Sequence, residues 1–261
     1  MASPAPAQVD PVISVHGVGI QFNRNPRRRL RWRDVVRHTA GVESKGMFWA
    51  FRNVSFTIHP GETVGVVGAN GEGKSTLLRL IAGVLLPDEG QVHVHGPVAA
   101  IIELQAGFNS DLSGRDNIYL KAGLHGRNRK WVDERFDEIV QFAGHQVAAS
   151  LDLPFRHYSS GMKVRLGFAL VTQLDEPIIL VDEVMAVGDK KFRRRCYRKF
   201  DELIAQGRTL FLVSHSEREL RRFCTRGLYL RDGELAFDGP LEQALAMYDE
   251  DQGVSDEDDD A

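Results

Sequence analysis

Hydrophobic residues in this chain fall mainly into short runs of strand length, separated by stretches with helical spacing. Continuous apolar runs of this kind are typical of buried parallel strands in α/β proteins. We expect strands at residues 13–18, 54–58, 63–68, 91–94, 177–181, 209–213, 227–231 and 234–237. Helical spacing predicts helices at residues 75–82, 114–124, 131–143, 163–173 and 241–248. The Asp-Gly pair at 232–233 joins the last two strands as a hairpin.

A glycine-rich loop between the third strand and the first helix is the most informative stretch. It reads Gly68-Ala-Asn-Gly-Glu-Gly-Lys-Ser-Thr76 and fits the phosphate-loop pattern. A surface turn without a ligand is the alternative, but the strand before it and the helix after it favour a nucleotide site. Lys74 is expected to reach the β- and γ-phosphates of ATP, and the Ser75 hydroxyl to bind Mg²⁺. The residues assigned to the nucleotide are Gly68, Asn70, Gly71, Gly73, Lys74, Ser75 and Thr76.

Two carboxylates end the apolar run at residues 177–181. Asp182 and Glu183 lie where the carboxyl end of a parallel strand meets ligands in such sheets. Asp182 is expected to hold Mg²⁺ through water, and Glu183 to act as a general base toward the attacking water. Alone, this pattern also fits a strand that runs into a charged turn. Downstream of a phosphate loop it indicates ATP hydrolysis.

Composition limits the class of protein. The 261 residues, 43% hydrophobic and 26% charged, suit one large or two small soluble domains. No apolar run approaches the ~18 residues of a membrane span, and the N-terminus lacks the features of a signal peptide. The spacing of Cys196 and Cys224 argues against a disulfide framework or zinc site and fits a reducing cytoplasm. Residues 1–11 and the acidic residues 249–261 are expected to be disordered.

Further motifs, in the same order along the chain, make it resemble the ATPase subunit of ABC transporters. Tyr158-Ser-Ser-Gly-Met162 corresponds to that family's Leu-Ser-Gly-Gly-Gln signature, with Ser159 and Gly161 in place and with Ser160 and Met162 as departures. His215 follows a strand and matches the switch histidine that touches the γ-phosphate. Ala186-Val-Gly-Asp189 matches the D-loop, which contacts the opposing subunit.

Two assignments follow from this resemblance alone. Gln105 occupies the position of the Q-loop glutamine, which implies a part in catalysis and in the Mg²⁺ site. Trp49 or Phe48 is the candidate to stack on adenine, although either side chain could equally belong to the core. The resemblance covers about residues 12–248.

The resemblance also implies a fold and partners. It implies an α/β P-loop NTPase fold with a mainly parallel core sheet, an antiparallel β portion and a helical subdomain at about residues 105–160. Two copies would bind two ATP molecules head to tail, each between Lys74 of one copy and Ser159 of the other. A separate permease in the membrane would receive the motion, which places the chain at the cytoplasmic face of the cell's inner membrane.

Three features resemble the branch that exports polysaccharides such as O-antigen and teichoic acid. They are the stretch from Glu103 to Tyr119, the Tyr-Ser-Ser-Gly-Met form of the signature, and Val187-Gly-Asp-Lys-Lys-Phe-Arg193 together with a basic insertion at 24–46. About a dozen residues follow the last predicted helix, so no carbohydrate-binding module is expected there. Among short members, the actinobacterial exporters of lipid-linked cell-wall galactan are the nearest match.

Alternatives remain for the substrate and for the basic insertion. The insertion holds Arg24, Arg27, Arg28, Arg29, Arg31, Arg33 and Arg37. It fits a solvated loop, a contact with anionic headgroups, or a site for the pyrophosphate of a lipid-linked glycan. Nucleic-acid binding is less favoured, because interleaved aromatics and a net basic domain are missing. A soluble ABC-type ATPase that acts on nucleic acid or ribosomes is the rival function, and a drug or lipid exporter is the rival within the family.

Overall fold

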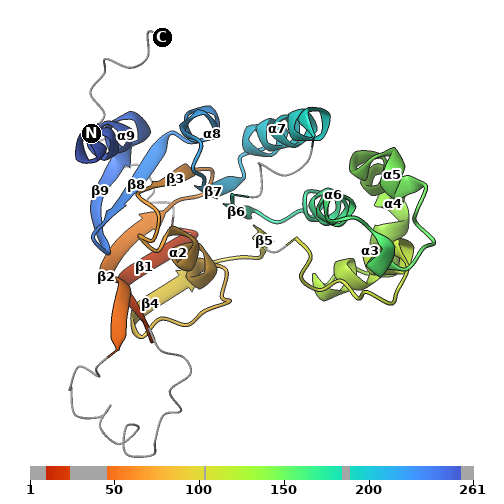
Figure 1. The fold of residues 1–261 in the computed structure, drawn as a ribbon, viewed down its shortest axis with the longest axis horizontal. Coiled ribbons are helices and arrows are strands. Elements are labelled where there is room, and N and C mark those ends of the chain that lie inside the picture. Colours follow the sequence, from red (N-terminus) through yellow and green to blue (C-terminus); the bar gives the residue numbers. More distant parts are fainter. Residues whose placement is uncertain (1–9, 24–45, 103, 184–188, 254–261) are drawn as a thin grey trace, which may run out of the picture. The chain divides into compact units, whose positions relative to one another are not determined.

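The computed structural model describes residues 10–23, 46–102, 104–183 and 189–253. Their elements form two compact units, which are described separately (Figure 1). The first unit draws on Met1–His59, Val64–His95 and Thr225–Ala261, and the second on Pro60–Thr63 and Gly96–Cys224. Predictions for residues 1–9, 24–45, 103, 186–188 and 254–261 lie outside the described residues.

An antiparallel sheet opens the first unit, as the fold class predicts. Its strands β1 (Ile13–Asn23), β2 (Met47–Ile58) and β4 (Glu89–Val94) lie in the order β2-β1-β4. Strands β1 and β2 are both longer than the sequence predicts. Register shifts after Val15 and Val18 break the alternation of apolar and polar positions, so the pattern hides the outer half of the ribbon.

A second group of strands in this unit frames the phosphate loop. Strand β3 (Thr63–Val67) is buried at every position and pairs in parallel with β8 (Arg226–Arg231), and β9 (Glu234–Pro240) pairs antiparallel with β8. Positive φ angles of 53° at Asp232 and 75° at Gly233 make the tight turn between β8 and β9, which confirms the predicted hairpin. Helix α2 (Lys74–Ile81) follows β3.

The last helix corrects one predicted boundary. Helix α9 spans Leu241–Gln252, so residues 249–252, which the sequence assigns to the acidic tail, are helical. Tyr229 donates a hydrogen bond to the Asp251 carboxylate at 2.6 Å, and Arg231 pairs with the same group at 2.7 Å. Two partners on β8 therefore fix an acidic side chain that composition alone marks as solvated.

Three parallel strands carry the second unit. Strands β5 (Val98–Ile101), β6 (Ile178–Asp182) and β7 (Thr209–Val213) lie in this order, and Asp182 pairs with Val213 at the carboxyl end. The sequence predicts β6 and β7 nearly residue for residue and misses β5, which is only four residues long. The carboxyl ends of β6 and β7 are the place where Asp182, Glu183 and His215 emerge.

Helices make up the rest of this unit. They are α3 (Gly114–Leu124), α4 (Arg129–Ala143), α5 (His145–Ala148), α6 (Ser160–Val171), α7 (Lys190–Ala205), α8 (Glu217–Phe223) and a 3₁₀ turn at Phe155–His157. Helices α3, α4 and α6 correspond to predicted helices, whereas α7 and α8 were not predicted. Helices α3 to α6 gather in one group (Figure 1). Ring contacts link α4, α6, α7 and α8 through Phe142, Phe168, Phe192, Phe200 and Phe223. No helix among the described residues is long and apolar enough to span a membrane.

Candidate functional site

The phosphate loop lies between β3 and α2, as the strand–loop–helix pattern predicts. Gly68 has a φ of 149°, and a Cβ there would lie 2.5 Å from the carbonyl oxygen of Leu230. Gly73, which caps α2, has a φ of 83°, and its Cβ would lie 2.7 Å from the ring of Phe51. Both φ values belong to the region that glycine favours. The path of the loop therefore depends on the absence of side chains at these two positions.

Two side chains complete the loop. The Lys74 residue is 6% exposed, and its Nζ donates to the carbonyl oxygens of Gly68 at 2.7 Å and Ala69 at 2.8 Å. The amine thus lies inside the curve of the loop. Glu72 accepts a hydrogen bond at 3.0 Å from the backbone N–H of Gly233, in the β8–β9 turn. The sequence pattern predicts the role of Lys74, but it leaves position 72 unspecified.

This arrangement fits a nucleotide phosphate. Ser75 and Thr76 occupy the first turn of α2, where backbone N–H groups have no partner within the helix and attract anions. Asn70 and Gly71 are exposed at the tip of the loop. Gly71 has a φ of 94°, and a Cβ there would meet nothing within 4 Å. The loop therefore combines an exposed tip with a buried lysine and a helix N-terminus.

The second unit brings Glu183 and His215 into contact, although the sequence assigns them separate roles, as general base and as switch histidine, and both roles stay predictions. Oε1 of Glu183 lies 2.7 Å from Nε2 of His215, and the two side chains are 48% and 49% exposed. The backbone N–H of Glu183 donates to the carbonyl oxygen of Val213 at 3.0 Å, which continues the β6–β7 ladder past Asp182. Both catalytic candidates are therefore fixed at adjacent strand ends while their side chains face solvent.

The backbone of Glu183 is unusual. Its φ of 37° lies in the left-handed region, which costs a residue with a Cβ about 1–2 kcal/mol. Only two other non-glycine residues of the described chain, Asn53 and Asp232, have positive φ. The bond to Val213 holds Glu183 in this conformation. A strained backbone at the end of β6 turns the carboxylate toward His215.

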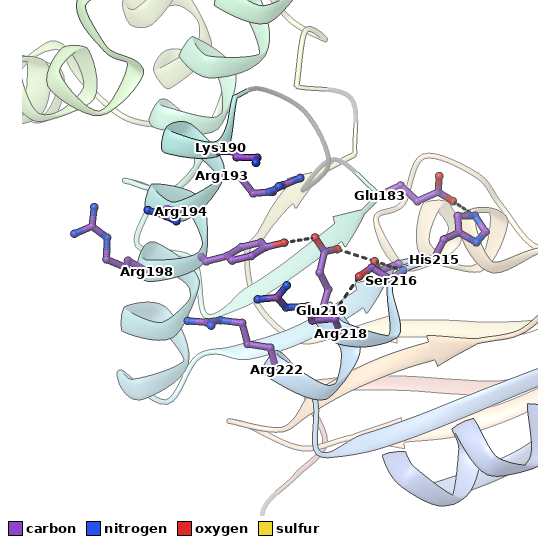
Figure 2. A pocket seen from close by; sticks show the side chains of 12 residues that line it. Glu183, Lys190, Arg193, Arg194, Arg198, His215, Ser216, Arg218, Glu219 and Arg222 are labelled. Carbon is purple, nitrogen blue, oxygen red and sulfur yellow. Dashed lines mark hydrogen bonds and ion pairs between the residues drawn. The ribbon is translucent and has the colours of Figure 1, made fainter. Parts of the chain in front are cut away.

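A basic cavity of about 1120 Å³ adjoins this pair. Figure 2 shows the Glu183–His215 contact at its edge and Glu219 farther inside. Lys190 and Arg193 from α7 and Arg218 and Arg222 from the region of α8 contribute cations to its wall. The cavity therefore combines the candidate base with a strongly positive surface that favours anions.

The signature residues lie at the start of α6. Ser159 is the N-cap, and its Oγ accepts from the backbone N–H of Met162 at 3.2 Å. Gly161 follows in the first turn, and a Cβ there would meet only Ser159 Oγ, at 4.0 Å. Ser159 is exposed, so the helix N-terminus is open to solvent. The predicted grip of these residues on a γ-phosphate from another copy stays a prediction.

Gln105 lies in an exposed turn, and its carbonyl oxygen accepts from Phe108 N at 3.3 Å. Its neighbour Leu104 is buried and accepts a hydrogen bond from Lys121 Nζ at 2.6 Å. Burial lowers the pKa of Lys121 to about 8. The turn is thus anchored by a buried lysine that sequence reasoning missed, and the catalytic and metal roles of Gln105 stay predictions.

Trp49 lies on β2 and is half-buried. The guanidinium of Arg52 lies 4.6 Å from the centroid of its ring and forms two hydrogen bonds with Glu89, at 2.8 and 2.7 Å. Phe48 is more exposed and lies 6.1 Å from Phe22, centroid to centroid. The role of either ring on adenine stays a prediction. Arg52 is a further group beside Trp49 that the sequence pattern does not reveal.

Sequence reasoning also missed the buried side chains that hold the segment around His215. The Glu219 residue is 7% exposed and accepts hydrogen bonds from Tyr197 and Ser214. One signal was available for α8, because Ser216 and Glu219 have the Ser-x-x-Glu spacing of a capping box. Another was available for α7, whose buried Phe192, Cys196, Phe200 and Leu203 recur at helical intervals.

Comparisons with known proteins agree with the motifs. A sequence profile described as ABC transporter matches residues 51–186. The ABC transporter protein AbcA of Aeromonas salmonicida is 38% identical, over 92% of this chain and 76% of that protein. The O-antigen export system ATP-binding protein RfbB of Klebsiella pneumoniae is 40% identical, over 77% of this chain and 81% of its own length. The teichoic acids export ATP-binding protein TagH of Bacillus anthracis is 41% identical, over 77% of this chain but only 36% of TagH.

Solved structures show a similar fold. A dimeric, post-hydrolysis structure of the ATP-binding cassette MJ0796 with ADP and Pi has a TM-score of 0.69 at 20% identity, and covers 88% of this chain and 98% of its own. An ATP binding subunit of an ABC transporter has a TM-score of 0.70 at 20% identity, over 93% of this chain and 94% of its own. At this identity the likeness concerns the fold, and it confirms the predicted fold class.

Proposed function

Because the chain belongs to the ABC transporter family, we propose that it is the ATP-hydrolysing subunit that powers export of a lipid-linked polysaccharide across the cytoplasmic membrane. Membership of this family gives it an ATPase activity coupled to transport. The Glu183–His215 contact of 2.7 Å is the observation that carries the catalytic part of the proposal. The names of the O-antigen and teichoic acid relatives support the class of cargo.

In this proposal the phosphate loop binds ATP, and side chains of the second unit catalyse its hydrolysis. Lys74 and the backbone N–H groups at the start of α2 neutralise the phosphates of ATP. Glu183 orients a water molecule toward the γ-phosphate and accepts its proton as the water oxygen bonds to the γ-phosphorus, while the bond from that phosphorus to the β–γ bridging oxygen breaks and ADP leaves. His215 holds the Glu183 carboxylate in place and offers a hydrogen bond to the γ-phosphate. The products are ADP and inorganic phosphate.

The proposed reaction uses Mg²⁺, and the chemistry of two side chains, one in each unit, suits this ion. Ser75 on α2 and Asp182 at the end of β6 present oxygen ligands, which Mg²⁺ prefers, and Mg²⁺ usually completes its shell with water and substrate phosphates. No cluster of three or more His, Cys, Asp and Glu side chains that would hold a metal alone occurs among the described residues. When bound, Mg²⁺ would neutralise charge on the β- and γ-phosphates.

Two partners complete the proposed machine. A second copy of the chain would supply Ser159 and Gly161, whose exposed helix start suits a phosphate, to the ATP held by Lys74. A permease subunit at the cytoplasmic face of the membrane would convert closure of this dimer into transport. The cargo we propose is a lipid-linked glycan, with cell-wall galactan as the specific candidate that the sequence resemblance suggests.

Affinity purification from the native host tests this proposal. The Glu183→Gln variant, tagged and expressed in that host, would be extracted from membranes in mild detergent. Mass spectrometry would then identify proteins and lipids that co-purify at equal stoichiometry, with Gly68→Ala as a control that does not bind ATP. We expect a multispanning permease with a lipid-linked glycan. Recovery with ribosomes or DNA-associated proteins would instead support the rival soluble ATPase, and a permease with a drug or phospholipid would refute the glycan.

A further inference from the structure

Glu219 on α8 is a buried carboxylate to which the reaction above assigns no role. Its Oε1 accepts from the Tyr197 hydroxyl at 2.6 Å, and its Oε2 accepts from the Ser214 hydroxyl at 2.7 Å. The residue is 7% exposed. Burying a carboxylate is costly unless hydrogen bonds satisfy it. Glu219 therefore depends on these two donors, and each donor is held in one orientation by the same carboxylate.

The two residues that flank His215 both form hydrogen bonds with Glu219, Ser214 with its carboxylate and Ser216 with its backbone. Ser214 donates to Glu219, and the Ser214 Oγ accepts from the backbone N–H of Ser216 at 3.1 Å. Ser216 in turn caps α8 by accepting from the backbone N–H of Glu219 at 3.4 Å. In an ordinary capping box the glutamate would return to the N–H of its own N-cap residue. Here the Ser214 hydroxyl takes that bond, and Glu219 is left to hold Ser214.

The other partner of Glu219 belongs to α7. Tyr197 lies two turns beyond Asp189, which caps α7 by accepting from Phe192 N at 2.8 Å. Arg165 of α6, the helix that Ser159 caps, pairs with Asp189 at 3.0 Å. A continuous series of contacts thus runs from α6 through α7 to Glu219, Ser214 and the His215 segment. Figure 2 shows Glu219 in the cavity, between α7 and the segment that carries His215.

We propose that Glu219 is a positioning residue for ATP hydrolysis, which holds the segment 214–216 so that the His215 imidazole meets the Glu183 carboxylate, and which links that segment to α7 through Tyr197. This inference rests on the proposed role of Glu183 and His215 in hydrolysis. Glu219 itself does not reach the reacting atoms, because its two oxygens are occupied by Tyr197 and Ser214. Its effect on the reaction is therefore transmitted through Ser214.

The hydrogen bond from Tyr197 to Glu219 persists at neutral pH. Burial, and then the hydrogen bond to Glu219, raise the pKa of Tyr197 to about 12, so the phenol remains a donor at neutral pH. Hydrogen bonds to an ionised acceptor are shorter and stronger than neutral ones. Replacing the carboxylate of Glu219 should therefore weaken the hold on Ser214 more than removing the Tyr197 hydroxyl does.

Kinetics and spectroscopy on full-length variants can separate positioning from simple stabilisation. We expect Glu219→Gln and Ser214→Ala to lower kcat for ATP hydrolysis about tenfold, the usual size for a hydrogen bond to a charged group, with little change in KM. Ser214→Thr keeps the hydroxyl, so it should retain most of the wild-type kcat. The double variant Ser214→Ala/Glu219→Gln should be no slower than the slower single variant, since both break one contact.

Nitrogen-15 NMR of the histidines gives a readout that does not depend on turnover. The His215 signals are assigned by their loss in His215→Gln. They should shift in Glu219→Gln and stay close to the wild-type positions in Ser214→Thr. Glu217→Gln is the matched control, because Glu217 is on the same helix and pairs with Arg221 instead, at 2.7 Å. It should alter neither kcat nor the His215 signals.

Each outcome decides the matter. If Glu219→Gln only lowers the melting temperature, while kcat per folded protein and the His215 signals match those of Glu217→Gln, the inference is wrong. If the wild-type chain does not hydrolyse ATP but the His215 signals still shift in Glu219→Gln, positioning holds and the proposed function fails. A shift together with a loss of kcat supports both.

Discussion

The phosphate loop and the His215 segment are held in place by opposite means. In the loop, Gly68 and Gly73 adopt φ angles of 149° and 83° in places where a Cβ would collide with Leu230 or Phe51. Around His215, a buried carboxylate and three hydroxyl groups hold the backbone, and they come from helices α7 and α8 and from the end of β7. The path of the phosphate loop depends on glycines, and that of the His215 segment depends on buried polar side chains.

This difference explains why the two regions should respond differently to mutation. The phosphate loop tolerates no side chain at two glycine positions, so a single substitution there should abolish ATP binding. The His215 segment is held by several hydrogen bonds that can be removed one at a time, so substitutions there should lower kcat in steps. Both behaviours can be measured on one protein, because nucleotide affinity and kcat report on them separately.

The largest effect is expected at Gly68. The Gly68→Ala variant places a Cβ 2.5 Å from the Leu230 carbonyl oxygen, so the loop must move and ATP binding should be lost, with destabilisation of about 2–4 kcal/mol. Isothermal titration with ATP would measure the affinity. Gly71→Ala is the matched comparison, because it shares the strain of a positive φ, here 94°, but its Cβ would meet nothing within 4 Å, so it should lose less affinity than Gly68→Ala. Equal losses in the two variants would refute the steric explanation.

The next effect is expected at His215. His215→Ala removes the partner that lies 2.7 Å from Glu183, so kcat should fall about 10²-fold or more, while the affinity for ATP should fall only by the worth of one hydrogen bond to the γ-phosphate. A steady-state phosphate-release assay, together with the same titration, would show both quantities. A variant that binds ATP poorly but hydrolyses what it binds at the normal rate would contradict the division of labour between the two regions.

A third effect concerns stability and pH. Burial lowers the pKa of Lys121 from 10.5 to about 8, so between these values the unfolded chain binds more protons than the folded one. The folded state should therefore gain stability as pH rises from about 8 to 10.5, by roughly 3 kcal/mol from this residue. Chemical denaturation across this range should show the gain, and Lys121→Met should remove it. Lys130→Met, at an exposed position on α4, is the control and should retain it.

The smallest effect is expected at Glu72, the side chain that ties the phosphate loop to the β8–β9 turn. Glu72→Gln replaces a charged acceptor for Gly233 N by a neutral one, which should cost about 1 kcal/mol or less and weaken ATP binding only a few-fold. Titration with ATP would show the change. A loss as large as that of Gly68→Ala would mean that the loop depends on side-chain support as much as the His215 segment does.

The sequence predicts the first region well for a physical reason. A loop that needs left-handed glycines, a buried lysine and a helix start within nine residues leaves a local pattern, from Gly68 to Thr76. The ends of β6 and β7 are predicted for the same reason, because apolar runs lead directly into Asp182 and toward His215. The contact between Glu183 and His215 is a finding of the structure that the motifs do not state.

The contacts that support the His215 segment and the turn at Gln105 are long-range and escape such patterns. Tyr197 and Glu219 are 22 positions apart, and Lys121 reaches Leu104 across 17 positions. Neither contact has a spacing that sequence reasoning could single out. The outer half of the β1–β2 ribbon was missed because bulges disrupt its period, and the end of α9 because Tyr229 and Arg231 hold an acidic side chain.

The most direct test of this account measures ATP affinity and ATP hydrolysis side by side in three variants. We predict that Gly68→Ala loses binding, whereas Glu183→Gln and Glu219→Gln bind ATP normally, with hydrolysis nearly abolished in the first of these two and reduced about tenfold in the second. Wild-type turnover in Glu183→Gln, or loss of ATP binding in both carboxylate variants, would contradict it.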